Sequence, residues 1–171
     1  YSLAADAWNA IIVLLTADNI EGPYNYEGVV LYGGICEDGD KTTAINQSRY
    51  EMSDFAKVLG TNDDLTRYTK TSQSLVSIID PNLQYDENGN LWMVFGSWSA
   101  GVYMIELDET TGFRDYNVKY ETKFNESDAY YGHKIAGGHY NSGEGPYLLQ
   151  TDDYYYLFMS IGNLEASGGY N

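Results

Sequence analysis

The 171 residues suffice for one domain with a sizeable core. With 25 acidic and 9 basic side chains the formal charge is −16, which argues against nucleic acid and anionic membranes as partners, because both attract basic surfaces. No apolar run is long enough to span a bilayer, and the single cysteine, Cys36, excludes an internal disulfide.

Tyrosine and glycine, each present 18 times, are typical of antiparallel β structure with many tight turns. Residues 1–18 match the later strands of a β-meander. Glu21 follows in the sequence Glu-Gly-Pro-Tyr, where the Gly-Pro step predicts a turn and a solvated glutamate with a structural role. Residues around 48–75 are polar and weakly helical, which predicts an insertion.

The central part of the chain predicts a complete antiparallel meander. A strand from Ile78 leads into the turn Asp-Glu-Asn-Gly-Asn, whose Asn-Gly step is typical of a hairpin. Strands at 91–96 and from Gly101 follow, and then a turn at 109–112. Residues 114–141 read as a second irregular stretch.

The last part of the chain repeats the start of this meander. Residues 143–150 contain a second Glu-Gly-Pro-Tyr, and with 154–160 they align with the strands from Ile78 onward. Each copy reads acid, proline, strand, acidic turn, aromatic strand and serine. Repeated four-stranded meanders are the mark of a β-propeller. We therefore expect an all-β fold and a single partial β-propeller domain over 1–171.

Two acidic residues, Asp80 and Glu144, head the first strands of neighbouring copies. The first strand of each propeller blade lines the central channel, so both carboxylates are expected to point into one funnel. A carboxylate pair across a pocket suits glycoside hydrolysis, because one group must hold a proton for the leaving oxygen and a like charge nearby raises its pKa. With 25 acidic residues in the chain, chance pairing is the alternative.

The segments SIIDPNLQYDENGNLWMVFGSWSAGVYMIELDETTG and GEGPYLLQTDDYYYLFMSIGNLEASGGYN resemble family 43 of the glycoside hydrolases, the group of arabinanases, arabinofuranosidases and xylosidases. The elements Ile-Asp-Pro, Gly-Ser-Trp, Glu-Gly-Pro-Tyr and Gly-Gly-Tyr-Asn occur here together and in order. The resemblance implies a five-bladed β-propeller of four-stranded antiparallel meanders, with about blades two to four present in this chain. It also implies inverting hydrolysis of arabinose- or xylose-containing plant polysaccharides or oligosaccharides.

On this resemblance, Glu144 is the general acid, and Asp80 orients it and raises its pKa. Ser97 and Trp98 lie where the family places residues near the substrate. His139 is a candidate for contact with the sugar or the acid, and a rim histidine without such a role is the alternative. No cofactor is required. Some relatives hold calcium in the channel, but no ligand set is visible in this sequence. A polymeric substrate implies secretion.

The chain departs from the family at the general base, which the family carries in a His-Asp-Pro-like motif of the first blade. No such motif occurs here. We therefore expect a fragment without the first blade and the C-terminal part, with weak or no activity by itself. Open strand edges predict a homo-oligomer. The alternatives are a non-catalytic carbohydrate-binding propeller remnant and an interaction propeller without a sugar ligand.

Overall fold

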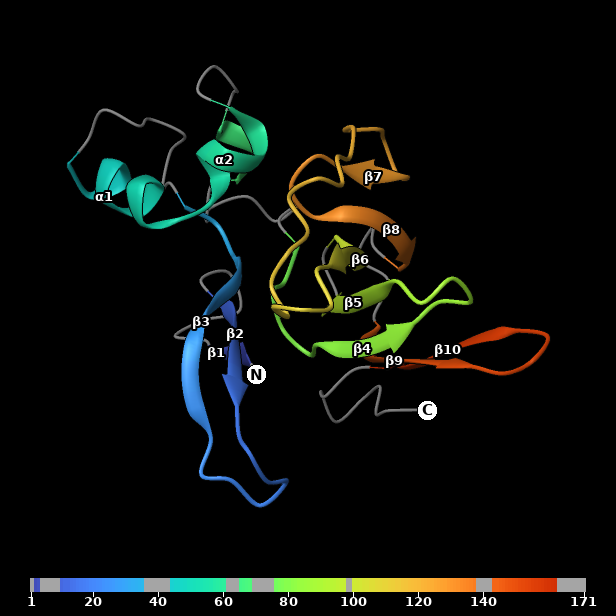
Figure 1. The fold of residues 1–171 in the computed structure, drawn as a ribbon. Helices are drawn as coiled ribbons and strands as arrows, with labels where there is room; N and C mark the ends of the chain where they lie inside the picture. The colour runs from blue at the N-terminus through green and yellow to red at the C-terminus, as the bar shows by residue number, and fades with distance from the viewer. Residues whose placement is uncertain are drawn as a thin grey trace.

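Three antiparallel sheets and a short helical segment make up the described part of the protein (Figure 1). The structure is a computed structural model, and it describes residues 2–3, 10–35, 44–60, 65–68, 76–97, 100–137 and 143–162. Figure 1 shows the first sheet beside the second, with the third sheet along the first strand of the second.

The first sheet contains β1 (Ser2–Leu3), β2 (Ile11–Thr16) and β3 (Asn25–Tyr32), paired in sequence order. The β-branched and leucine side chains of β2 suit a pleated, half-buried surface, which explains why this stretch forms a strand. Glu21 lies exposed in the turn between β2 and β3, so the solvated position predicted from the Gly-Pro step is confirmed.

The second sheet has the strand order β4-β5-β6-β8-β7. Its members are β4 (Asn82–Tyr85), β5 (Leu91–Ser97), β6 (Gly101–Leu107), β7 (Ser127–Asp128) and β8 (Gly132–Ala136). β5 and β6 lie where the sequence predicted them, whereas β4 begins at Asn82, four residues after the predicted start at Ile78. Together with β8 they form the expected four-stranded antiparallel meander, and the two-residue β7 pairs with the outer side of β8.

The prediction of an irregular stretch over 114–141 is wrong for its later part, because β8 lies there. This strand is short and has little alternation of its own. It forms because β6 offers a free edge, to which Val102 and Met104 contribute the pairing partners. Gly132 opens the strand with φ +82°, and a side chain at this position would overlap the Met104 carbonyl oxygen. Tertiary pairing therefore decides this element.

The third sheet is the hairpin of β9 (Glu144–Gln150) and β10 (Tyr155–Ser160). One face of β9 lies against β4 and β5. The opposite face of the hairpin is exposed and largely aromatic, and it carries Tyr147, Leu149, Tyr156 and Phe158. An apolar face of this kind is uncommon on a free surface of a protein.

The helical segment consists of α1 (Ala44–Met52), α2 (Phe55–Leu59) and the 3₁₀-helix η1 (Thr66–Tyr68). It overlaps the insertion predicted around 48–75 and begins a few residues earlier. Among the described residues, no helix is long and apolar enough to cross a membrane.

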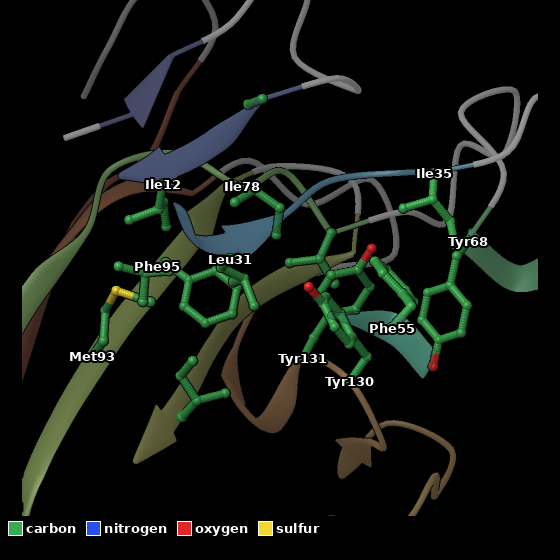
Figure 2. Close-up of a cluster of buried hydrophobic side chains, with 14 of the residues drawn as sticks. Ile12, Leu31, Ile35, Phe55, Tyr68, Ile78, Met93, Phe95, Tyr130 and Tyr131 are labelled. Carbon is green, nitrogen blue, oxygen red and sulfur yellow. The ribbon is translucent and has the colours of Figure 1, made fainter. Parts of the chain in front are cut away.

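One hydrophobic core joins the helical segment to the first two sheets (Figure 2). Phe55 of α2 stacks on Tyr130 with ring centroids 3.6 Å apart and an angle of 13° between the planes. Such a ring pair contributes about 0.5–1.5 kcal/mol beyond its buried area. Figure 2 shows other side chains of the same core, including Ile12, Leu31, Ile35, Tyr68, Ile78, Met93, Phe95 and Tyr131. The helical segment is therefore packed into the domain.

A buried polar cluster holds the helical segment against the chain that follows β6. The carboxylate of Asp54 accepts hydrogen bonds from the hydroxyls of Tyr130 and of Tyr116, the latter at 3.0 Å. Arg114 Nε lies 3.7 Å from Asp54 Oδ2, and the Arg114 side chain is only 2% exposed. The Tyr130 hydroxyl in turn accepts the backbone N–H of Tyr32 in β3 at 3.2 Å. The Asp54 carboxylate thus joins the helical segment to the chain after β6, and the Tyr130 hydroxyl connects this cluster to β3.

Candidate active site

Strands β4 and β9 begin at the same end of their sheets, and the two predicted acidic residues lie there. Asp80 comes two residues before β4, and Glu144 is the first residue of β9. Because the partner strands are antiparallel, the last residue of β5, Ser97, and the last residue of β10, Ser160, lie at this end as well. The structure therefore brings these polar residues together at the same end of the second and third sheets.

Asp80 has an unusual backbone conformation. Its φ of +56° is in the left-handed region, which asparagine and aspartate tolerate better than other residues with a side chain. The residue before it, Ile79, is tied to β5, because its carbonyl oxygen accepts the backbone N–H of Gly96 at 3.0 Å. Outliers of this kind cluster at functional sites, where the surrounding structure holds them in place.

The carboxylate of Asp80 reaches the strand that carries Glu144. Asp80 Oδ2 accepts a hydrogen bond from the backbone N–H of Gly145 at 3.1 Å. Sixty-five positions separate the two residues in the sequence. The structure thus brings Asp80 to the residue directly after Glu144, and Glu144 itself is partly exposed.

The backbone around Glu144 is irregular. Gly145 has φ +60°, and an added Cβ there would meet no atom within 4 Å. Glu144 pairs with Ser160, and the β9–β10 register shifts between Phe158 and Ser160. A register shift locally disrupts the ladder. Regular strand pairing by itself therefore leaves the position of Glu144 loosely defined.

Ser97 is 1% exposed, and its Oγ is a buried polar atom that has no hydrogen-bond partner among the residues that the structure describes. Such atoms are rare in folded proteins and each calls for an explanation. The preceding Gly96 has φ +113°, and a Cβ there would lie 2.5 Å from the Gly101 carbonyl oxygen, so the turn requires glycine. Trp98 and His139, the other two predicted substrate contacts, lie outside the described residues.

Sequence reasoning missed a second contact between the same two strands. Asn82 Oδ1 accepts a hydrogen bond from the backbone N–H of Leu148 at 2.8 Å. Asp80 and Asn82 are two positions apart and bind backbone groups of β9 that are three positions apart. The available signal was a polar residue directly after Asp-Pro, at the first position of a strand.

The opposite ends of the same sheets are also joined. The hydroxyl of Tyr155 accepts the backbone N–H of Glu87 at 2.9 Å and donates to the Glu87 carboxylate. This hydrogen bond lowers the pKa of Glu87 and raises the pKa of Tyr155.

The turn between β4 and β5 is organised by Asp86. Its carboxylate accepts hydrogen bonds from Trp92 Nε1 at 3.0 Å, from the Asn90 side chain at 2.9 Å, and from the backbone N–H groups of Asn88 and Asn90. Desolvation raises the pKa of Asp86, but these hydrogen bonds outweigh it and lower the pKa to about 2. The predicted hairpin is confirmed, but its turn is centred on Glu87 and Asn88, because the Gly89 N–H donates to the Asp86 carbonyl oxygen at 3.1 Å.

A cavity of about 460 Å³ lies between the second and third sheets. Its lining is mostly apolar and includes Trp92, Met104, Ile135, Leu148 and Leu157. Side-chain packing therefore does not fill the space between β9 and the second sheet at this level.

The arrangement suits proton transfer. Glu144 is partly exposed at the start of β9, and Asp80 binds the next residue of that strand. In this position the Glu144 carboxyl group can donate a proton to an oxygen atom of a bound molecule. Within the described ranges, no group of three or more His, Cys, Asp or Glu side chains is placed to hold a metal ion.

Comparison with known proteins adds a family likeness to this geometry. A model of the family described as "Glycosyl hydrolases family 43" matches residues 42–170. The chain is 34% identical over 168 residues to the "Extracellular endo-alpha-(1->5)-L-arabinanase 2" of Bacillus subtilis (strain 168), covering 97% of this chain. It is 35% identical over 162 residues to the "Extracellular endo-alpha-(1->5)-L-arabinanase" of Thermotoga petrophila, covering 94% of this chain. The chain spans 28% of the length of each of these relatives.

Solved structures give the same likeness. The crystal structure of the endo-1,5-alpha-L-arabinanase from Thermotoga petrophila RKU-1 matches with a TM-score of 0.64 and 35% identity. This match covers 95% of the present chain and 29% of the arabinanase chain.

Proposed function

This chain belongs to glycosyl hydrolases family 43, and from that premise we propose that it takes part in the hydrolysis of α-(1→5)-linked arabinan with inversion of configuration. The substrate follows from the two relatives whose names state an endo-arabinanase activity. The same names call those proteins extracellular, so the proposed place of action is outside the cell.

The observation that carries this proposal is the hydrogen bond from Gly145 to Asp80. It joins the Ile-Asp-Pro element to the Glu-Gly-Pro-Tyr element, the two motifs that head β4 and β9. Glu144 is proposed as the general acid that protonates the leaving oxygen, and Asp80 as the carboxylate that orients it. Ser97, Trp98 and His139 are proposed as contacts to the sugar.

The water that attacks an inverted centre needs a general base. These 171 residues contain no His-Asp-Pro-like motif to supply it, so we propose that they hydrolyse arabinan slowly or not at all by themselves. The three sheets are proposed to be neighbouring blades of a five-bladed propeller, with a homo-oligomer formed through open strand edges. Calcium in a propeller channel remains a proposal without identified ligands.

The function can be tested with a nucleophile that needs no general base. Azide attacks carbon without being deprotonated, so the chain is incubated with linear α-(1→5)-arabino-oligosaccharides and sodium azide. In this reaction the new bond forms between azide and C1, the bond from C1 to the leaving oxygen breaks, and the Glu144 proton passes to that oxygen. The expected product is the β-configured glycosyl azide, identified by NMR.

The variant Glu144→Gln keeps the shape of the side chain but has no proton of suitable acidity. We expect it to lower the rate of azide transfer by about 10²- to 10⁴-fold. Equal rates in wild type and Glu144→Gln contradict the assignment of the acid. Binding of the oligosaccharides without any transfer supports the alternative, a carbohydrate-binding remnant. Retention of configuration in the product contradicts the inverting mechanism.

A further inference from the structure

We infer that Asn82 is a positioning residue for Glu144, because its side chain, together with that of Asp80, accepts a hydrogen bond from the backbone of strand β9. This inference rests on the proposed role of Glu144 as the general acid. Asn82 has no place in the motifs that predicted the site, and it touches β9 four positions away from Glu144.

Strands β4 and β9 belong to different sheets, so no backbone ladder joins them. Their connection at the functional end consists of side-chain acceptors on β4 and the residues before it, and backbone donors on β9. Asp80 takes the N–H of Gly145 at 3.1 Å, and Asn82 takes the N–H of Leu148 at 2.8 Å. The two donors lie about 10 Å apart along an extended strand.

Two contacts at this separation do what one cannot. The Gly145 contact fixes the start of β9, and the contact of Tyr155 with Glu87 holds the far end of the β9–β10 hairpin. A second bond at Leu148 fixes the direction of the strand as well as its position along β4. The direction of β9 in turn decides where its first residue, Glu144, directs the carboxyl group.

The backbone next to Glu144 departs from regular strand geometry. Gly145 has φ +60° in open space, and the β9–β10 ladder shifts its register next to Ser160, the partner of Glu144. The cavity of about 460 Å³ lies beside the Leu148 side chain, so packing leaves this part of β9 room to move. The hydrogen bond between Asn82 and Leu148 is partly buried, so it is stronger than a bond fully exposed to water, which would compete for the same groups.

Proton donation is sensitive to such movement. The acid must lie within hydrogen-bond reach of the leaving oxygen, and a displacement of about 1 Å can lower a rate about 100-fold. Loss of the Asn82 acceptor is therefore expected to affect steps that need the acid and to spare steps that do not.

The experiment compares wild type with Asn82→Ala, Asn82→Asp and Asn88→Ala in the azide reaction. Asn82→Asp keeps an oxygen acceptor at the same place. Asn88→Ala is the matched control, because Asn88 is exposed in the β4–β5 turn and its backbone N–H, rather than its side chain, donates to Asp86. Two aryl glycosides of an arabino-oligosaccharide serve as donors. One has 2,4-dinitrophenolate as its leaving group and needs no acid, and the other has an unsubstituted phenol and needs it.

We expect Asn82→Ala to lower kcat/KM about 10- to 100-fold with the phenyl glycoside and less than about threefold with the dinitrophenyl glycoside. For Asn82→Asp and Asn88→Ala, the ratio of kcat/KM with the phenyl glycoside to kcat/KM with the dinitrophenyl glycoside should equal that of wild type. Amide hydrogen exchange, followed by NMR on the same chains without substrate, gives a second measurement. In Asn82→Ala, exchange should accelerate at Leu148 and also at Gly145, whose own acceptor is intact.

An equal fall with both glycosides overturns the inference, since it indicates a general loss of folded protein. An unchanged ratio overturns it as well. If wild type transfers neither glycoside to azide, the proposed function fails, and hydrogen exchange alone decides the placement of β9. Unchanged exchange at Gly145 in Asn82→Ala then refutes the coupling of the two contacts.

Discussion

Asp80 binds the backbone N–H of Gly145 from a left-handed backbone conformation, with a distance of 3.1 Å and φ +56°. The contact therefore depends on a conformation that few side chains tolerate. Asparagine accepts the same φ and keeps an oxygen acceptor but loses the charge, whereas alanine loses the acceptor and strains the backbone.

We expect Asp80→Asn to keep the urea unfolding midpoint of wild type and to lower azide transfer to the phenyl glycoside by about tenfold or more. Asp80→Ala should lower the free energy of unfolding by about 1–2 kcal/mol in addition. A variant Asp80→Asn with wild-type transfer would show that the charge has no part in the reaction.

Gly132 and Gly89 form a matched pair of positions with nearly the same backbone conformation, φ +82° and +87°. A Cβ at Gly89 would meet no atom within 4 Å, whereas a Cβ at Gly132 would overlap the Met104 carbonyl oxygen and lie 2.7 Å from Ile105 Cγ2. In urea denaturation, we expect Gly132→Ala to lower the free energy of unfolding by about 1–3 kcal/mol more than Gly89→Ala does. Equal costs would mean that β8 moves away from β6 without penalty.

Asp54 neutralises Arg114 where both are largely buried, with side chains 11% and 2% exposed. The variant Asp54→Ala leaves a buried cation without its partner and removes the acceptor for two tyrosine hydroxyls. We expect it to lower the free energy of unfolding by about 3–5 kcal/mol. Asp153→Ala, in the exposed turn before β10, is the control and should change it by less than about 0.5 kcal/mol. Similar effects for the two variants would contradict the role of the cluster.

Tyr116, near Asp54, and Tyr103, near Asp128, predict that the folded protein loses stability at alkaline pH. Burial and the charge of Asp54 raise the pKa of Tyr116 from 10.0 to about 12, and burial and the charge of Asp128 raise the pKa of Tyr103 to about 12. A pKa raised in the folded state means that the folded protein holds its protons longer, so stability is intact below pH 10 and falls between pH 10 and about 12.

This loss is measured by urea denaturation at increasing pH, with tyrosinate absorbance recorded in parallel. Asp54→Asn removes one cause of the shift at Tyr116 and should move the ionisation of that group to lower pH. Constant stability between pH 10 and 12 would contradict the burial of these hydroxyls.

Local sequence was sufficient for most strands. Each of β4, β5, β6, β9 and β10 follows a turn signal. β5 and β6 contain both β-branched and aromatic side chains, and β4, β9 and β10 contain aromatic ones, which suit a pleated surface. Turn chemistry at Asp86 is also local, since its partners lie within six positions. For this reason the hairpins, and the equivalence of Asp80 and Glu144 as heads of strands, were predictable.

Tertiary structure decided what depends on partners far away in the chain. β8 has little alternation of its own and forms because β6 presents a free edge to it. The helical segment joined the core through contacts such as the stacking of Phe55 on Tyr130, 75 positions apart. The contacts of Asp80 with Gly145 and of Asn82 with Leu148 span 65 and 66 positions. A hydrogen bond depends on the position of both groups to within a fraction of an ångström, which no residue pattern along one strand contains.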